Sequence, residues 1–414
     1  MKEWIKKPEL LAPAGSYENL VTAVKYGADA VYLGGSVLGL RAKAKNFSPA
    51  EMAAGVAYAR ENGVKVYVTV NVFAHNQDIK AAKTYLRELG EEIKPDALIV
   101  ADPGLLMLIR ETLPEMEIHL STQANNTNYL TYRFWHGQGV KRAVLARELS
   151  LAEISEIRGN IPADMEIEGF VHGAMCMSYS GRCLISNYLT GQDANHGACT
   201  QSCRWKYHLV EETRPGEYLP VSEDENGTYF FNSKDLCMID HLEDIMAAGL
   251  DSLKIEGRMK TPLYVATVVK AYRQAIDLCL SDLAAYQAKK AYFLAEVGKC
   301  SHRHFDTGFF YGRPQNGQIY ENSAYIKDYV FTAKVLGYDS ASGLHLIEQR
   351  NKFSVGDTLE ILTQRGENLS FSVEAIRTES GEGKISATLA KEKLWLRLPE
   401  PVAPETIIRR PAGE

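Results

Sequence analysis

The sequence lacks both an excess of basic residues and any long uninterrupted hydrophobic run. Its 46 Lys and Arg residues stand against 52 Asp and Glu residues, which gives a formal net charge of −6 at pH 7. This balance excludes a surface coated in positive charge for bulk nucleic-acid binding, but it leaves room for a local basic groove. We find no apolar stretch long enough for a signal peptide or a membrane span. We therefore expect a cytoplasmic protein with no membrane partner.

Several catalytic signatures are also absent. The chain has no H-E-x-x-H motif, which argues against the commonest zinc peptidase arrangement, and no C-x-x-C motif, which disfavours a thioredoxin-like dithiol. It has no G-x-S-x-G nucleophile elbow either, because the nearest stretch, MSYSG, lacks the first glycine. A hydrolase of one of these familiar types is not indicated.

The chain has the composition to bury a large core, with 45% hydrophobic residues and only 15 prolines in 414 residues. From Pro8 to about Leu280, short apolar runs alternate with amphipathic helical stretches, which is typical of strands joined by crossover helices. Eight strands are predicted, at residues 9–15, 30–35, 64–74, 97–102, 117–124, 142–148, 165–173 and 251–258. Eight such units favour a closed TIM-type (β/α)8 barrel, with an open doubly wound sheet as the alternative.

Helix boundaries are indicated by capping residues. Ser16, Ser48 and Ser150 each precede a helical stretch and are followed within three residues by a glutamate, as in a capping box. Gly27 and Gly63 follow helical stretches and predict helix ends. These signals predict helices that begin just after Ser16, Ser48 and Ser150.

Two further segments complete the predicted architecture. A long insertion from about 173 to 240 follows the seventh strand, and long excursions of this kind usually serve function. Beyond residue 324, short β-rich runs separated by polar turns predict a small all-β barrel or sandwich. We therefore expect a barrel domain over 1–323, including the insertion, and a β-barrel domain over 324–414.

Polar side chains gather where the predicted barrel strands end. Because active sites of TIM barrels lie at the carboxyl ends of the strands, this face is the expected catalytic face. The alternative is that these residues only mark the entry into solvated loops. The polar residues are Asn71, His75, Asp102, Gln123, Asn125, Arg147, Glu148, Glu168, His172, Lys254, Glu256 and Arg258.

The insertion carries four of the seven cysteines, in a C-x6-C-x15-C-x3-C array: Cys176, Cys183, Cys199 and Cys203. Reduced cytosolic thiols that cluster in this way more often bind metal than form disulfides. The irregular spacing suits a [4Fe-4S] cluster, which four thiolates ligate, better than a zinc site built from two tight knuckles. Zinc and four unliganded thiols are the alternatives. Cys237 is a fifth candidate ligand, whereas Cys279 and Cys300 are interpreted as packing residues.

Several separated motifs resemble peptidase family U32, the collagenase-like proteases. They are PELLAPAGSYENLVTAVKYGADAVYLGG, EGFVHGAMCMSYSGRCLISNY, GACTQSCRWKY, FNSKDL and SLKIEGRMKTPLYVATVVKAYRQAID, and they cover about residues 8–280. The resemblance implies either peptidase activity or iron–sulfur hydroxylase activity. Within the family, the sequence looks most similar to the subgroup that hydroxylates the wobble uridine of tRNA to 5-hydroxyuridine, with prephenate as the implicated metabolite. It also implies tRNA and a small anionic metabolite as partners, and a second subunit of the same family.

The resemblance transfers the four cysteines of the array as cluster ligands. On the hydroxylase hypothesis, Arg147, Arg182, Lys254 and Arg258 would neutralise carboxylates or phosphates, and Tyr179, Trp205 and Tyr264 would stack on a flipped base. His172 would act as an acid or base or as a partner of the cluster, and Glu168 and Glu256 would orient the basic residues or the substrate. A cysteine peptidase would instead pair one thiol with His172, and a third hypothesis is a non-catalytic tRNA-binding protein with a structural metal site.

Overall fold

The computed structural model describes residues 7–39, 46–175, 234–312 and 325–412, together with Ser186, Thr190, Gln192 and Thr200. Between these ranges it also gives the backbone of short strands in the insertion and shortly after residue 312. They are β8 (Leu209–Val210), β9 (Tyr218–Leu219), β10 (Ser222–Asp224), β11 (Gly227–Tyr229), β12 (Asn232–Ser233) and β16 (Gln318–Ile319).

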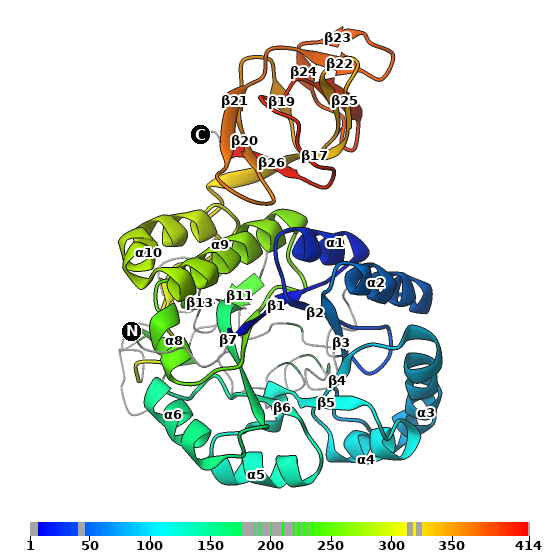
Figure 1. Ribbon diagram of the computed structural model, residues 1–414, viewed down its shortest axis with the longest axis vertical. Helices are drawn as coiled ribbons and strands as arrows, with labels where there is room; N and C mark the ends of the chain where they lie inside the picture. Colours follow the sequence, from blue (N-terminus) through cyan, green and yellow to red (C-terminus); the bar gives the residue numbers. More distant parts are fainter. Residues whose placement is uncertain are drawn as a thin grey trace.

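The first part of the chain forms a closed barrel of eight parallel strands (Figure 1). The sheet is closed because the last barrel strand, β14, pairs with both β1 and β7. The prediction of a TIM-type barrel is confirmed. The barrel strands are β1 (Glu9–Pro13), β2 (Ala30–Leu33), β3 (Lys65–Val70), β4 (Ala97–Val100), β5 (Glu117–Leu120), β6 (Arg142–Val144), β7 (Glu166–Ala174) and β14 (Ser252–Ile255).

Helices form a ring around the barrel (Figure 1). The α-helices are α1 (Tyr17–Lys25), α2 (Pro49–Glu61), α3 (Ile79–Glu88), α4 (Pro103–Thr112), α5 (Tyr129–Gly137), α6 (Leu151–Asn160), α8 (Leu242–Ala247), α9 (Pro262–Ser281) and α10 (Leu283–Gly298). Shorter turns are η1 (Asn76–Asp78), η2 (Leu89–Ile93) and η3 (Thr122–Ala124). Among the described residues, we find no helix both long and apolar enough to cross a membrane.

The predicted helix boundaries are confirmed in their physical detail. Ser48 and Ser150 each form a complete capping box with the glutamate three residues later, and Ser16 accepts a hydrogen bond from Asn19 N. Gly27 and Gly63 adopt φ angles of +103° and +73° just beyond α1 and α2. This left-handed conformation is the one for which glycine is the usual helix terminator.

Several predicted strands run past their observed carboxyl ends, and those predicted over 64–74 and 142–148 end at Val70 and Val144. At β5 the overrun hides a turn at the carboxyl end of the barrel. The predicted strand over 117–124 ends at Leu120, and η3 follows it at once. The backbone turns here because Ala124 N donates to Ser121 O and because Asn125 takes a left-handed conformation with φ 53°. Side chains of this short turn therefore stand over the barrel end and do not continue a strand.

The end of the insertion returns to the barrel beside β7. Strand β13 (Asp235–Cys237) pairs antiparallel with the last residues of β7, and β15 (Phe305–Asp306) pairs parallel with β13. Cys237 thereby lies opposite His172 in the ladder. Because β7 is lengthened and covered in this way, its carboxyl end is buried among other elements.

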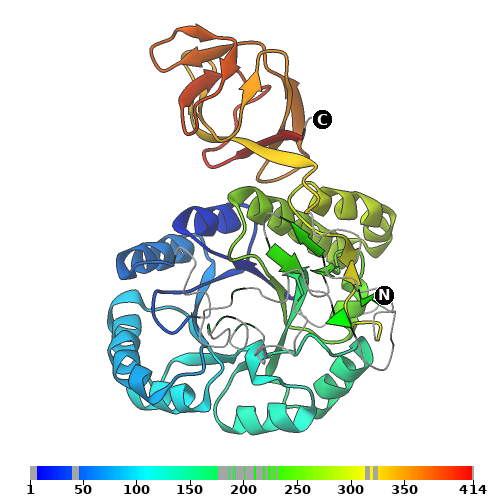
Figure 2. The ribbon, with the colours of Figure 1, turned by 180° about the vertical axis from the view of Figure 1, so that it is seen from behind.

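The chain from β17 onward forms a separate antiparallel β domain with its own hydrophobic core, as expected for a small β-barrel (Figures 1 and 2). Its main sheet has the order β21-β20-β26-β17-β18-β25-β22-β23, and β19 pairs with β24 beside it. The strands are β17 (Tyr329–Asp339), β18 (Leu344–Gln349), β19 (Phe353–Ser354), β20 (Thr358–Leu362), β21 (Leu369–Ser372), β22 (Ile376–Thr378), β23 (Gly383–Lys384), β24 (Ser386–Ala387), β25 (Lys393–Leu396) and β26 (Ile407–Pro411).

The β domain is held against the helices of the barrel by buried polar contacts. Arg409 of β26 is fully buried and reaches Glu296 of α10 at 2.8 Å and Glu360 of β20 at 2.5 Å. The hydroxyl of Tyr26, just after α1, donates to the carbonyl of Leu362 at 2.7 Å. A buried arginine that binds two carboxylates holds them in one arrangement, because separating it from either one would leave an uncompensated buried charge. The two domains are therefore locked together on the side of α1, α9 and α10 (Figure 2).

Candidate active site at the carboxyl end of the barrel

The inside of the barrel is divided into two polar ends by an apolar middle. Alternate residues of each strand point inward, and the inward residues of β1 to β4 form a small apolar cluster that is separate from the main core. This cluster consists of Leu11, Ala30, Tyr32, Tyr67, Ala97 and Ile99. Polar side chains lie at the amino ends of the strands on one side of it and at the carboxyl ends on the other.

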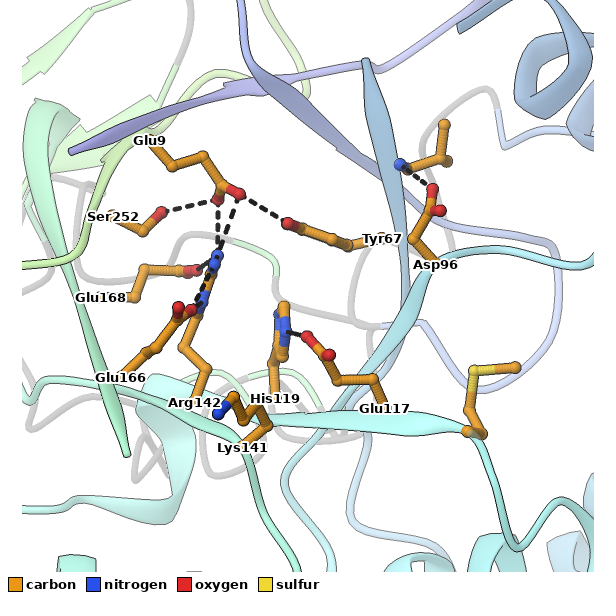
Figure 3. Close-up of polar contacts among 12 residues, drawn as sticks. Glu9, Tyr67, Asp96, Glu117, His119, Lys141, Arg142, Glu166, Glu168 and Ser252 are labelled. Atoms are coloured by element: carbon orange, nitrogen blue, oxygen red, sulfur yellow. Dashed lines mark hydrogen bonds and ion pairs between the residues drawn. The ribbon is translucent and has the colours of Figure 1, made fainter. Parts of the chain in front are cut away.

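The amino end is closed by a network around Arg142, the first residue of β6. Its guanidinium contacts Glu9 at 2.5 Å, Glu166 at 2.7 Å and Glu168 at 3.3 Å, and Glu9 also accepts a 2.6 Å hydrogen bond from Tyr67 (Figure 3). Three of these residues are the first residues of their strands. In TIM barrels this end serves stability, whereas the opposite end carries the chemistry.

The prediction that Glu168 lies at the catalytic end is wrong. It is the third residue of the nine-residue β7, it is fully buried, and it binds Lys254 at 2.7 Å as well as Arg142. Burial opposes its charge, but Lys254 and Arg142 outweigh burial and keep the pKa of the Glu168 carboxyl below its ordinary value. Lys254 also lies 4.5 Å from the ring centre of Tyr32. These two predicted site residues thus form an internal ion pair at mid-barrel.

Arg258 and Arg147 do lie at the carboxyl end, as predicted. Arg258, three residues after β14, donates to Thr69 at 3.4 Å and to Asn46 at 3.0 Å. Arg147, three residues after β6, donates to the carbonyl oxygen of Ala174 and lies 4.0 Å from the ring centre of Phe170. Two guanidinium groups at one barrel mouth can bind a carboxylate or phosphate through paired hydrogen bonds.

Neutral amides from β3 and η3 share this end of the barrel. Asn71 Nδ2 donates to the hydroxyl of Ser121 at 3.5 Å, and that hydroxyl donates to Gln123 Oε1 at 3.1 Å. Asn126 is buried beside β6, where its main-chain carbonyl oxygen accepts a hydrogen bond from Ala146 N. The sequence had indicated Asn71, Gln123 and Asn125, but it did not single out Ser121, which lay inside the predicted strand, or Asn126, which lay just beyond it. The mouth therefore offers both charged and neutral hydrogen-bonding groups.

His172 lies at the carboxyl end of β7, packed among aromatic rings and not open toward the barrel mouth. Its ring centre is 5.5 Å from those of Tyr272 and Phe305, and Tyr272 Oη lies 3.4 Å from His172 Nδ1. Burial, aided by nearby His302, lowers the pKa of His172 to about 3. The imidazole is therefore neutral near pH 7, which excludes it as a general acid there. Glu256 is half-buried next to it, and Glu256 N donates to His172 O.

The burial of His172 predicts a dependence of stability on pH. Its pKa is about 3 in the folded protein and about 6.5 when unfolded, so below about pH 6.5 only the unfolded chain gains the proton. The free energy of unfolding should fall as the pH drops, by up to about 1.4 kcal/mol per pH unit from this group. Urea unfolding at pH 5.0 to 7.5 measures the slope, which His172→Phe should flatten.

Tyr272→Phe provides the matched control for that experiment. It removes the Tyr272 hydroxyl beside His172 but keeps the imidazole. It should therefore lower the free energy of unfolding while leaving its dependence on pH as in the unmodified protein. Equal slopes for the unmodified protein and His172→Phe would contradict the assignment.

Other predicted site residues have structural roles or lie outside the described residues. Tyr264 is a core aromatic and not a stacking platform, since it is 2% exposed and donates to Glu256 O at 2.8 Å. Asp102 caps α4 by accepting from Leu105 N. The residues outside the described ranges are Cys176, Tyr179, Arg182, Cys183, Cys199, Cys203 and Trp205.

The three described cysteines are buried separately. Burial raises the pKa values of Cys237, Cys279 and Cys300 to about 12, so all three are thiols at neutral pH. Within the described part of the chain, no group of three or more His, Cys, Asp and Glu residues is arranged to hold a metal ion. The interpretation of Cys279 and Cys300 as packing residues agrees with their positions in the core.

Comparison with known proteins agrees with this architecture over nearly the whole chain. The chain is 41% identical over 406 residues to tRNA hydroxylation protein P1 of Bacillus subtilis, covering 98% of this chain and 95% of that protein. It is also 41% identical over 439 residues to tRNA hydroxylation protein P of Escherichia coli, covering 95% and 94%. A protein named Collagenase from Porphyromonas gingivalis is 30% identical over 405 residues, covering 93% and 95%.

Two family profiles divide the chain at the same place as the structure. The profile of peptidase family U32 matches residues 15–320, which hold the barrel, and that of the U32 C-terminal domain matches residues 327–409, which hold the β domain. With both profiles matched in order, this chain belongs to peptidase family U32.

Proposed function

We propose that the protein is a tRNA-modifying enzyme that hydroxylates the wobble uridine to 5-hydroxyuridine. The observation that carries the proposal is the 41% identity, over nearly the full length of both chains, to proteins named for tRNA hydroxylation. The barrel mouth supports it, because guanidinium groups and neutral amides lie together there. A nucleotide modified at its base must be unstacked and held by such groups.

The cofactor proposed for this enzyme is a [4Fe-4S] cluster on Cys176, Cys183, Cys199 and Cys203. The donor set fits, because four thiolates are the usual ligands of such a cluster, and the three remaining cysteines are buried apart as thiols. When bound, the cluster supplies one-electron redox chemistry. The alternative for the same four ligands is zinc.

The residues of the barrel mouth would bind the small anionic metabolite, proposed to be prephenate. Prephenate is a dicarboxylate, and Arg147 and Arg258 can each bind one carboxylate through two parallel hydrogen bonds. Phe170 lies between the mouth and the interior, with Arg147 at 4.0 Å and Lys254 at 5.4 Å from its ring centre. On this proposal, Arg147 and Arg258 would be the two anchoring cations, while Glu168 neutralises Lys254 beneath them.

The function is tested by measuring 5-hydroxyuridine in tRNA from cells that lack this protein. We expect the modified nucleoside to be lost and to be restored by the unmodified gene, with Arg258→Met restoring less than a tenth of it if this guanidinium binds the metabolite. Lys141→Met, at the opposite end of the barrel, is the control and should restore the full level. Unchanged 5-hydroxyuridine in cells lacking the protein would refute the proposal.

Peptidase activity is the second candidate, and the 30% identity to the protein named Collagenase favours it. Among the described residues, the three cysteines are protonated and His172 is enclosed by aromatic rings, so none of them forms a Cys–His pair of the papain type. A gelatin cleavage assay on anaerobically purified protein tests this candidate directly. A third hypothesis, tRNA binding without turnover, predicts affinity for tRNA but no effect on 5-hydroxyuridine.

A further inference from the structure

The carboxyl end of the barrel holds buried amide atoms without a hydrogen-bond partner. They are Asn71 Oδ1, Gln123 Nε2, Asn125 Oδ1 and both polar side-chain atoms of Asn126, considering the described part of the chain. Gln123 is 4% exposed and Asn126 is 1% exposed. An unsatisfied buried polar group costs about 1–3 kcal/mol, and native proteins contain few of them. Such atoms gathered at a catalytic face point to a polar ligand.

The amide of Gln123 is held in one orientation. Asn71 and Ser121 both point inward, since they continue the inward-facing alternation of Thr69 on β3 and His119 on β5. The Ser121 hydroxyl accepts from Asn71 Nδ2 and donates to Gln123 Oε1. This chain fixes Oε1 as the occupied atom of the Gln123 amide and leaves the buried Nε2 without an acceptor among the described residues. An acceptor that reaches this position would meet a donor of defined orientation.

The chemistry of these amides suits a neutral base better than an anion. The Watson–Crick edge of uracil presents an acceptor, a donor and an acceptor, at O4, N3–H and O2. Carboxamides match such an edge, because each carries one donor group and one acceptor group. Cytosine has a donor at N4 and an acceptor at N3 in place of the first two. An N–H aimed at O4 of uracil would face another N–H in cytosine.

We propose that Gln123 Nε2 donates to O4 of the flipped uracil, and that Asn71 and Asn126 complete the recognition of its Watson–Crick edge. The three amides would then set the preference for uridine over cytidine, while Arg147 and Arg258 bind the anionic metabolite. This inference rests on the proposed function, because it takes a uridine of tRNA as the substrate.

The test compares binding of two anticodon stem-loop RNAs that differ only by U or C at the wobble position. The unmodified protein, purified anaerobically, should bind the U stem-loop 10 to 100-fold more tightly by fluorescence anisotropy, as expected for one good base contact of about 1–3 kcal/mol. Gln123→Glu keeps the shape and the contact with Ser121 but replaces the donor by a carboxylate oxygen. It should weaken binding of the U stem-loop at least 10-fold and reverse or abolish the preference for U.

Gln138→Glu is the matched control, since it adds the same charge at an exposed position just after α5. It should leave the ratio of the two affinities unchanged. Asn126→Asp is a second variant, which should also reduce the preference for U even if Gln123→Glu does not fold. An unchanged ratio of affinities in folded Gln123→Glu and Asn126→Asp proteins would overturn the inference. Failure of the proposed function would look different, because then the unmodified protein would show no preference and cellular 5-hydroxyuridine would not depend on it.

Discussion

Replacement of any one of Cys176, Cys183, Cys199 and Cys203 by alanine is expected to remove bound iron and abolish formation of 5-hydroxyuridine. Each cysteine is proposed to supply one of four thiolates, and a cubane cluster that loses a protein ligand is exposed to loss of iron. The measurement is iron and sulfide analysis of anaerobically purified proteins, with visible absorption as a second readout. Zinc is determined on the same samples to distinguish the two metals.

Cys237→Ala is the matched control for that series. Its thiol is buried in β13 opposite His172, and among the described residues it belongs to no group of three or more side chains that could hold a metal ion. Iron content and the modified nucleoside should both be retained. Iron retained after replacement of Cys176, or lost after replacement of Cys237, would contradict the proposed ligand set.

Arg142→Met is expected to destabilise the protein by about 3–5 kcal/mol without touching the catalytic face. The substitution leaves Glu9, Glu166 and Glu168 buried or partly buried beside one another, with Lys254 as the remaining cation in contact with Glu168. Breaking one member of a buried charge network is costly because the remaining charges are uncompensated. The free energy of unfolding from urea titration gives the measurement.

Two further variants show whether the network is responsible. Lys141→Met removes the neighbouring half-buried cation, which donates to Asp164 O outside the network, and should change the free energy of unfolding by less than about 0.5 kcal/mol. Arg142→Lys keeps the charge but cannot contact three carboxylates with one planar fork, so its stability should lie between those of Arg142→Met and the unmodified protein. Similar stabilities for Arg142→Met and Lys141→Met would show that the network contributes little.

The architecture was predictable from the sequence because its signals are local. Short apolar runs marked all eight barrel strands, which are three to nine residues long, and serine caps such as Ser48 and Ser150 marked helix starts within a residue. The end of β5 was not predictable, since β-branched and polar residues continue past Leu120 with no proline or glycine to stop them. Only the tertiary position of the segment reveals the turn at η3.

The candidate site was predictable in part. Arg147 and Arg258 follow their strands by three residues, so any barrel with these strands places them at the mouth. Glu168 and Lys254 could not be placed, because a polar residue inside a strand faces either the catalytic end or the middle depending on where the strand begins. Likewise, Arg142 contacts Glu9, which lies 133 positions away in the sequence. Local sequence patterns cannot predict a contact between residues so far apart.

The position of β26 sets the order in which the molecule can be completed during synthesis. This strand is the last of the β domain to leave the ribosome, yet it lies between β17 and β20 in the middle of the sheet and carries Arg409. Since domains generally fold from the amino terminus onward as they emerge, the barrel must fold while its partner still lacks a central strand. Until then, the faces of α1, α9 and α10 that receive the β domain stay uncovered, and Glu296 contacts Lys299 without its second cation, Arg409. We therefore expect that a stall before the codons of β26 would leave the nascent barrel with these faces exposed to solvent.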